Sequence, residues 1–245
     1  GLINYKSMLT ADWVWFNSNF HRDILFSELE VFLKLFPEAA FHVKEANRCR
    51  LKSKVIPLGI DTESIDSKRM DKDLSPAILW NHRWEYDKNP DLFFNTLIRL
   101  SEEGHTFDLY VTGEKYSKSP SVFSKAESQL KRHVKHWGFV ADRKTYYQIL
   151  WRCNILPVTA NQEFFGLSVL EAMYCGVQPL LPNRLSYSDL YAKLDVFYSS
   201  DDAFYDTLKG LVSNYKVHTY RSEVTNYGWK SVAKTYDKEL IKVLQ

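Results

Sequence analysis

Two glutamates stand on either side of one short turn in the segment NQEFFGLSVLEAMYCGVQPLL, residues 161–181. Glu163 and Glu171 are separated by seven residues, with Gly166 between them, and an apolar run with helical spacing follows. A carboxylate can accept hydrogen bonds from both hydroxyls of a vicinal diol, and glycine lets the backbone approach a ligand closely because it has no Cβ. The pattern therefore indicates a ligand with hydroxyl groups at both of its ends.

The start of the helix after Gly166 could hold an anion between these two acids. The first N–H groups of that helix, near Leu167, Ser168 and Val169, have no intrahelical partner and lie at the positive end of the helix dipole. A diphosphate would satisfy them, with a sugar toward one glutamate and a ribose toward the other. A structural interpretation also stands, because acidic residues are common at helix starts, where they complement the dipole.

Two cationic side chains, Arg83 and Lys88, occur in an earlier segment, HRWEYDKNP, residues 82–90. Arginine binds phosphate through a bidentate fork, and lysine offers a mobile point charge. Ligands of open parallel sheets bind outside the carboxyl ends of the strands, so both side chains could converge on the helix start. Taken alone, such residues in a polar loop are more often simply solvated.

Both segments lie where short β-rich runs alternate with longer helical patterns. We expect strands within 77–84, 107–113, 134–140, 154–160, 177–182 and 195–199, and helices at 89–104, 119–136, 142–153, 167–176, 201–214 and 229–244. Strands that alternate with helices of ten or more residues form parallel sheets covered on both faces. The sequence therefore predicts an α/β fold with a Rossmann-like parallel sheet.

The first 54 residues do not follow this alternation. They offer one strand at 13–17, a cap at Ser18 or Asn19, and a helix whose apolar residues run from Phe20 to Phe36. One strand and one helix cannot bury so much apolar surface. This stretch is either an appendage on the main sheet or the remnant of an absent N-terminal domain, and we favour the remnant. Residues 55–225 then form the nucleotide-binding domain, and 226–245 a helix that packs back toward the N-terminal domain.

Composition excludes several classes of protein. The 245 residues carry a net charge of +2, too small to indicate a nucleic-acid or membrane partner by itself. No apolar run reaches the ~18 residues that a membrane span needs. Three widely spaced cysteines fit reduced, structural thiols in the cytoplasm. No carboxylate pair has a clear metal role, since Asp201 and Asp202 fit a helix start, and we expect no metal cofactor.

Four ordered segments resemble the retaining, group 1 family of nucleotide-sugar glycosyltransferases, which have the two-domain GT-B fold. They are VIPLGID, the Arg-x4-Lys of RWEYDK, WGFVADRKTYYQIL and the Glu-x7-Glu of EFFGLSVLE, and together they cover residues 55 to about 185. The resemblance implies that this chain contains the C-terminal half of a GT-B fold, including the donor site.

The resemblance also implies a role for each matching residue. Arg83 and Lys88 would bind the donor diphosphate, Glu163 the sugar hydroxyls and Glu171 the ribose. Arg83, Lys88 and Glu163 would then be the catalytic residues. The other donor-binding residues would be Gly113, Phe139, Val140, Phe165, Gly166, Leu167 and Ser168, with the backbone near Gly138 meeting the base.

Three departures from the family pattern point to a narrower group. His82 replaces the usual glycine before the arginine, only Gly113 remains of a Gly-x-Gly, and Phe164 replaces a glycine beside the sugar. WNHRWEYDKNPDLFF, QEFFGLSVLEAMYCGVQPLLP and VWFNSNFHRDILFSELEVFLKLFPE are similar to the tRNA-queuosine mannosyltransferases. That resemblance implies GDP-mannose as donor, no required cofactor, and queuosine in tRNA as acceptor, bound by the complete enzyme.

The same resemblance predicts a donor-binding fragment with little or no turnover, whose exposed remnant would meet the missing N-terminal domain or a second copy. For tRNA itself, residues 125–136 would place Lys125, Lys131, Arg132 and Lys135 on one helix, although a solvated face is the preferred interpretation. Two other functions stay open. A glycoside hydrolase could use Glu163 and Glu171 as its acid and nucleophile, and the bulky Phe164 is compatible with a non-catalytic nucleotide-binding module.

Overall fold

The computed structural model of the chain describes residues 2–72, 75–115, 119–214 and 218–244. The chain divides into two compact units. Unit 1 comprises residues 1–59 and 227–245, and unit 2 comprises residues 60–226. Among the described residues, no helix is both long and apolar enough to cross a lipid bilayer.

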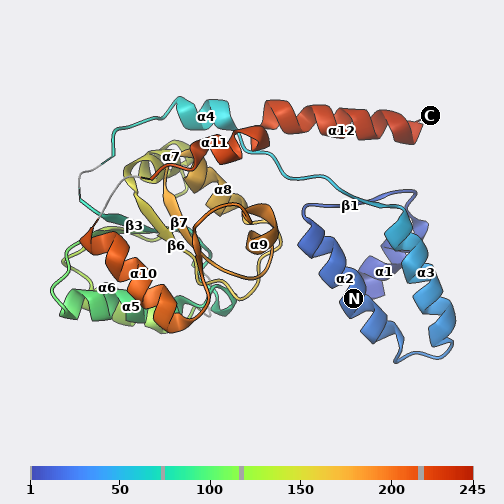
Figure 1. Cartoon of the computed structure of the whole chain (residues 1–245), viewed down its shortest axis with the longest axis horizontal. Coiled ribbons are helices and arrows are strands. Elements are labelled where there is room, and N and C mark those ends of the chain that lie inside the picture. Colours follow the sequence, from blue (N-terminus) through green and yellow to red (C-terminus); the bar gives the residue numbers. More distant parts are fainter. Residues whose placement is uncertain (1, 73–74, 116–118, 215–217, 245) are drawn as a thin grey trace. The chain divides into compact units, whose positions relative to one another are not determined.

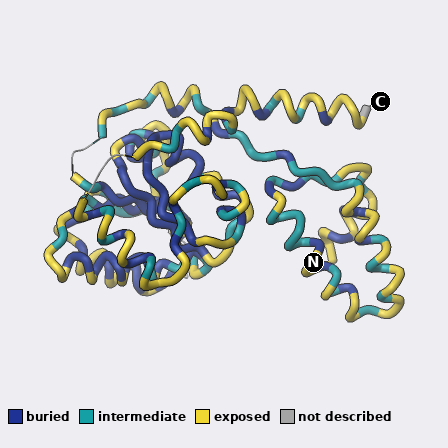
Figure 2. Tube along the Cα trace, viewed as in Figure 1, coloured by how far each residue is buried: buried dark blue, intermediate teal, exposed yellow. Residues whose placement is uncertain are grey.

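Unit 2 is built on a six-stranded sheet in the order β5-β4-β3-β6-β7-β8, with every neighbouring pair parallel. The strands are β3 (Ala77–Trp80), β4 (Asp108–Val111), β5 (Val134–Trp137), β6 (Ile155–Pro157), β7 (Gln178–Pro182) and β8 (Phe197–Tyr198). All residues of β3, β6 and β7 are buried, as continuous apolar runs with both faces covered require (Figure 2). The expected α/β fold with a parallel sheet is confirmed.

Helices cover both faces of this sheet (Figure 1). α5 (Pro90–Glu102) packs against α6 (Val122–Gln129) and α10 (Asp201–Ser213), while α7 (Arg143–Arg152) packs against α8 (Leu167–Tyr174). Short helices complete the unit: α4 (Thr62–Asp66), α9 (Tyr187–Leu190) and α11 (Arg221–Val224), with 3₁₀ turns η1 (Tyr86–Lys88) and η2 (Thr225–Tyr227). Several helices begin where a polar side chain accepts a hydrogen bond from a backbone N–H group. The side chain of Asn89 does so for α5, that of Asp142 for α7 and that of Ser200 for α10.

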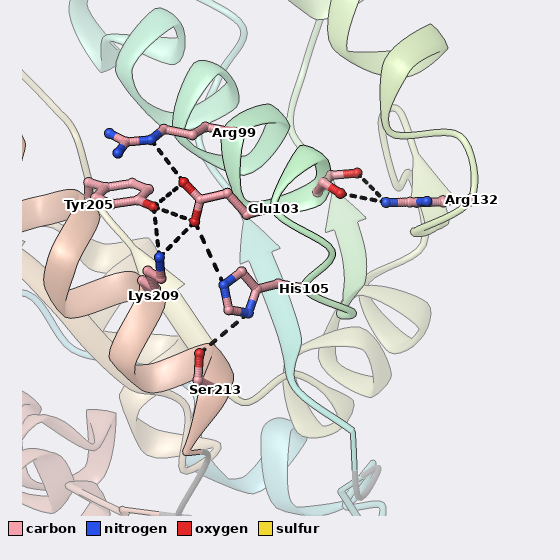
Figure 3. A network of polar contacts seen from close by, with 8 residues as sticks. Arg99, Glu103, His105, Arg132, Tyr205, Lys209 and Ser213 are labelled. Carbon is pink, nitrogen blue, oxygen red and sulfur yellow. Dashed lines mark hydrogen bonds and ion pairs between the residues drawn. The ribbon is translucent and has the colours of Figure 1, made fainter.

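The predicted helix over 119–136 is wrong beyond Gln129, where α6 ends. His133 is buried instead, and its ring stacks on Phe107 with centroids 4.1 Å apart. Arg132 turns back and donates two hydrogen bonds to Ser101, at 2.6 and 2.9 Å (Figure 3). The basic residues of 125–136 therefore do not share one helix face. Leu130 and Val134 keep helical spacing in the sequence, but burial of His133 and pairing of β5 determine the fold.

A network around Glu103 joins the end of α5 to α10 (Figure 3). The Glu103 carboxylate accepts hydrogen bonds from the Tyr205 hydroxyl at 2.5 Å and from Lys209 at 2.8 Å, and from Arg99 at 3.2 Å. Arg99 also lies over the Tyr205 ring, 3.6 Å from its centroid. Hydrogen bonds from Lys209 and Tyr205 lower the pKa of Glu103 to about 2. The network is structural and keeps α10 on the face that α5 covers.

Unit 1 contains α1 (Leu2–Thr10), β1 (Val14–Phe16), α2 (Asn19–Leu33), α3 (Ala39–Leu51), β2 (Ser53–Val55) and α12 (Trp229–Leu244). β1 and β2 pair in parallel, and α12 contacts both through the rings of Trp15 and Tyr236 and a 2.6 Å ion pair between Lys54 and Glu239. The sequence predicted β1, α2 and a cap at Ser18 or Asn19, of which Ser18 is the cap, but it missed α1, α3 and β2. α3 buries only small side chains, Ala46 and Cys49, and therefore has no strong apolar periodicity. That residues 1–54 are the remnant of a larger domain stays a prediction.

Candidate functional site

A cavity of about 430 Å³ opens at the carboxyl end of β3 beside the start of α8. Two stretches that are distant in the sequence form it: residues 81–88, with the loop after β3 and the turn η1, and residues 162–168, which lead into the start of α8. Its lining residues are Asn81, His82, Arg83, Asp87, Lys88, Gln162, Glu163, Phe164, Leu167 and Ser168. Five of the predicted site residues, Arg83, Lys88, Glu163, Leu167 and Ser168, thus line one cavity.

The turn η1 places Lys88 in this cavity. Asn89 adopts a left-handed backbone conformation with φ of 48°, and its side chain caps α5. The Thr159 hydroxyl, just beyond the end of β6, donates to the carbonyl oxygens of Lys88 at 2.8 Å and Asn89 at 2.9 Å and so fixes the turn. Lys88 is consequently buried, with only 7% of its surface exposed. An ammonium group held this rigidly loses little entropy when it binds an anion.

Two carboxylates neutralise Lys88. Its Nζ donates to the carbonyl oxygen of Gln162 at 2.7 Å and lies 3.1 Å from Asp87 and 3.5 Å from Glu163. Burial raises the pKa of Glu163, but Lys88, the backbone N–H of Phe165 and His82 together outweigh it, and the pKa lies below its ordinary value. Glu163 is therefore an anion at neutral pH, and it can accept hydrogen bonds from hydroxyl groups.

Arg83 and His82, its neighbour, differ in their freedom to move. The Arg83 side chain is about half exposed and pairs with Glu85 at 3.1 Å, so it can swing toward a ligand. His82 is 4% exposed, and its Nε2 has no hydrogen-bond partner among the described residues. Burial and the nearby Lys88 lower the pKa of His82 to about 4. The residue that replaces the family's glycine is therefore a neutral imidazole in the wall of the cavity.

Gly166 shapes the start of α8. It occupies the N-cap with φ of +81°, and a Cβ there would lie 2.9 Å from the Tyr187 ring and 3.6 Å from Cγ of Glu163. The prediction that Val169 offers a free N–H is wrong, because that N–H donates to the carbonyl oxygen of Gly166 at 3.0 Å. This bond tightens the first turn of α8 and leaves the N–H groups of Leu167 and Ser168 as the candidates for an anion.

Replacing Gly166 by alanine is expected to lower the free energy of unfolding by at least ~1–2 kcal/mol, the cost of a left-handed conformation for an L-residue. The close approach of the Tyr187 ring adds to that cost. Urea denaturation of the variant measures it. Gly210→Ala is the matched control, because Gly210 lies inside α10, where an added methyl group would meet nothing within 4 Å beyond its own helix. The free energy of unfolding of that control should rise by ~0.5–1 kcal/mol, because alanine is favoured over glycine inside a helix. Equal effects of the two changes would contradict the assigned strain.

Glu171 lies outside the cavity lining. It is on α8, beyond Ser168, and 7% exposed. Its Oε1 is 3.5 Å from the Arg143 guanidinium, and its Oε2 accepts a hydrogen bond from the Tyr146 hydroxyl at 3.3 Å. Burial raises the pKa of Glu171, and Arg143 and Tyr146 only partly oppose this rise. Glu163 and Glu171 do not face one cavity, so the structure gives no support for a hydrolytic acid and nucleophile pair.

The remaining predicted donor residues are not among those that line the cavity. Gly113 has φ of +96°, and a Cβ there would collide with the carbonyl oxygen of His82, so this glycine permits close packing against the loop after β3. Phe165 is buried in the core, whereas Phe139 is 62% exposed and Val140 partly exposed beyond β5. Their contacts with a nucleotide stay predictions.

Asn81, Asp87 and Gln162 line the cavity but were not predicted. They adjoin predicted residues in the sequence, and that adjacency was the only available signal. For metals, the described ranges contain no group of three or more His, Cys, Asp or Glu side chains that could hold an ion. Asp201 and Asp202 lie in the first turn of α10, as predicted. Cys49, Cys153 and Cys175 are buried, and none of the three forms a disulfide.

Two families match consecutive stretches of this chain. Residues 61–226 match the family described as glycosyl transferases group 1, and residues 1–60 match the one described as tRNA-queuosine alpha-mannosyltransferase N-terminal. The chain is 31% identical over 209 residues to the tRNA-queuosine alpha-mannosyltransferase of Drosophila melanogaster. That similarity covers 82% of this chain and 55% of the relative, so the chain spans about half of that protein.

Solved structures share the fold. A glycosyltransferase from Rickettsia africae superposes with a TM-score of 0.72 at 14% identity, covering 100% of this chain and 68% of that one. The Anabaena protein HepE in complex with UDP has a TM-score of 0.66 at 14% identity, covering 95% and 64%. At these identities the likeness shows the fold alone. The sequence matches show more: this chain belongs to the group 1 glycosyltransferase family and is related to the tRNA-queuosine mannosyltransferases.

Proposed function

We propose that unit 2 binds the nucleotide-sugar donor of a retaining glycosyltransferase, with GDP-mannose as donor and queuosine in tRNA as acceptor of the complete enzyme. The observation that carries the proposal is the cavity in which Arg83, Lys88 and the start of α8 converge beside Glu163. The name of the Drosophila relative supports the mannosyl and queuosine parts of the proposal. The three buried cysteines, none of which forms a disulfide, support a cytoplasmic protein.

In this function the cavity stabilises the diphosphate as it leaves the sugar. Negative charge develops on the departing oxygen, and fixed positive groups that face it lower the barrier; removing one such donor typically costs ~3 kcal/mol. Lys88 is held by η1, the Leu167 and Ser168 N–H groups by α8, and Arg83 can swing in as a bidentate fork.

Glu163 would hold the sugar. Its Oε1 accepts backbone N–H groups from Phe164 at 3.0 Å and Phe165 at 3.3 Å, which fixes the carboxylate in place. Oε2 lies toward Lys88 and retains lone pairs for sugar hydroxyls. Because Lys88 contacts this carboxylate, the sugar and diphosphate subsites would adjoin one another. No cofactor is needed in this account, since every group that acts belongs to the chain or the donor.

Isothermal titration of the full chain with GDP, UDP, ADP and GDP-mannose tests the proposal. We expect GDP and GDP-mannose to bind more tightly than UDP or ADP, and inorganic pyrophosphate to compete with them. Preference for UDP would overturn the GDP assignment but keep the donor site. Failure of every nucleotide to bind would overturn the donor site itself.

A non-catalytic nucleotide-sugar-binding module is the second candidate. Phe164 lines the cavity and is 46% exposed where the family pattern has a glycine, so it reduces the room for a sugar. The two candidates differ in one measurement. A module would bind GDP-mannose yet transfer no mannose to queuosine-containing tRNA when the full-length protein is assayed, whereas the transferase would transfer it.

A further inference from the structure

We infer that Tyr146 is a positioning residue, which holds the Glu171 carboxylate for a ribose diol and couples it, through Asn81, to the diphosphate end of α8. The inference rests on the proposed function, because it assumes that a nucleoside diphosphate occupies the site with its ribose toward Glu171. It concerns α7, a helix that contributes no residue to the cavity lining.

Hydrogen bonds connect the two ends of the site through Tyr146. Its hydroxyl donates to Oε2 of Glu171 at 3.3 Å and accepts from Nδ2 of Asn81 at 3.4 Å. Nδ2 of Asn81 also donates to the carbonyl oxygen of Ser168 at 2.9 Å. The Asn81 amide and the Tyr146 phenol therefore connect Ser168, in the first turn of α8, to Glu171 in the next turn. The two contacts of the Tyr146 hydroxyl are long, and hydrogen bonds of this kind often shorten when a ligand binds.

Tyr146 is better suited than Arg143 to orient Glu171. The Arg143 side chain is 73% exposed, so its 3.5 Å contact with the carboxylate is open to solvent and screened. The Tyr146 hydroxyl lies in a buried environment, which raises its pKa well above the ordinary value, so it stays a proton donor across the physiological range. A donor that occupies one lone pair of Oε2 leaves the other lone pairs of Glu171 for a diol.

Asn81 offers this network a buried hydrogen-bond acceptor that is still unpaired within the described part of the chain. Its side chain lines the cavity, is 8% exposed, and has an Oδ1 with no hydrogen-bond partner among the described residues. Buried polar atoms are normally paired, and leaving one unpaired costs free energy. A hydroxyl group of a bound ligand would satisfy this oxygen. The same amide would then contact the ligand on one side and Tyr146 on the other.

A purely structural Tyr146 would affect all ligands alike, so nucleotides without ribose hydroxyls separate the two roles. We would titrate the full chain with GDP and with 2′,3′-dideoxy-GDP, and compare wild type, Tyr146→Phe, Glu171→Gln and the double variant. Wild type should prefer GDP by at least about tenfold, the contribution of one hydrogen bond to a charged group. Tyr146→Phe should lose most of that preference, because the change weakens the binding of GDP and leaves the binding of 2′,3′-dideoxy-GDP unchanged.

Tyr198→Phe is the matched control. Its hydroxyl donates to the carbonyl oxygen of Val158 at 2.9 Å in the sheet, so the change removes a buried phenol hydroxyl away from Glu171. It should leave the ratio of the two affinities unchanged. Tyr146→Phe should have no further effect in the Glu171→Gln background, because it acts through that carboxylate.

Three outcomes overturn the inference, and they are distinguishable. Equal weakening of both nucleotides by Tyr146→Phe would show a structural role only. Equal wild-type affinity for the two nucleotides would show that Glu171 does not read the ribose, while the donor site itself stands. Failure of wild type to bind either nucleotide would remove the proposed function and this inference with it.

Discussion

Replacing Lys88 by methionine is expected to weaken GDP binding by about a hundredfold, the usual consequence of losing one fixed cation that faces a phosphate. Methionine keeps the length of the buried side chain but removes its charge. Asp87 and Glu163, which lie 3.1 and 3.5 Å from the Lys88 ammonium, would then face the incoming diphosphate without compensation. Titration calorimetry measures the effect.

The effect of Lys88→Met should also depend on pH, because Lys88 is the main group that lowers the pKa of Glu163 against its burial. Without Lys88 that pKa rises, so Glu163 becomes neutral at a higher pH than in wild type. A neutral Glu163 repels phosphate less. The ratio of the GDP affinity of wild type to that of Lys88→Met should therefore decrease toward one as the pH falls from 8 to 5. Each comparison is made at one pH, because the phosphate itself titrates.

Lys135→Met is the control for this experiment. Lys135 is half exposed and pairs with Asp108 on the sheet, 3.3 Å away, so its loss should leave GDP affinity unchanged. The double variant Lys88→Met/Glu163→Gln should recover part of the lost affinity, since one of the two carboxylates is then neutral. If Lys88→Met folds as wild type does and binds GDP within twofold of it, Lys88 is not a diphosphate ligand.

The sequence predicted the six strands and the longer helices of unit 2 because these elements depend on local signals, but it missed the short helices α4, α9 and α11. Continuous apolar runs gave the strands, and polar residues such as Asp142 before the helices gave their starts. Arg83 and Lys88 could be placed near Glu163 because the carboxyl ends of parallel strands meet at one edge of a sheet. In the structure, these three residues line one cavity.

Contacts between distant segments could not be predicted in the same way. Nothing in the spacing of α7 shows that Tyr146 would reach Glu171 on α8, or that Asn81 would connect the two. Likewise, the helical spacing of 119–136 gave no sign that His133 would stack on Phe107. Packing against a residue that is distant in the sequence fixes each of these side chains. Local sequence patterns do not show which distant residues will be in contact.

Replacing Glu163 by glutamine should separate the sugar from the diphosphate, with effects of opposite sign on two ligands. GDP should bind as tightly as to wild type or more tightly, because one negative charge beside Lys88 is gone while Asp87 still pairs with it. GDP-mannose should bind about tenfold more weakly relative to GDP, because a neutral amide is a poorer acceptor for sugar hydroxyls than a carboxylate. Transfer by the complete enzyme should fall by ~10² or more.

Glutamine keeps an oxygen that can accept the N–H groups of Phe164 and Phe165, so the loop before α8 should hold its shape in this variant. Glu223→Gln, an exposed change on α11, controls for the loss of one carboxylate and should alter neither affinity. Parallel titrations with GDP and GDP-mannose therefore give the answer as a ratio of two dissociation constants. Equal weakening of both ligands would mean that Glu163 supports the loop and does not contact the sugar. Weaker binding of GDP-mannose with GDP binding intact requires that the carboxylate contacts the sugar, because only the sugar distinguishes the two ligands.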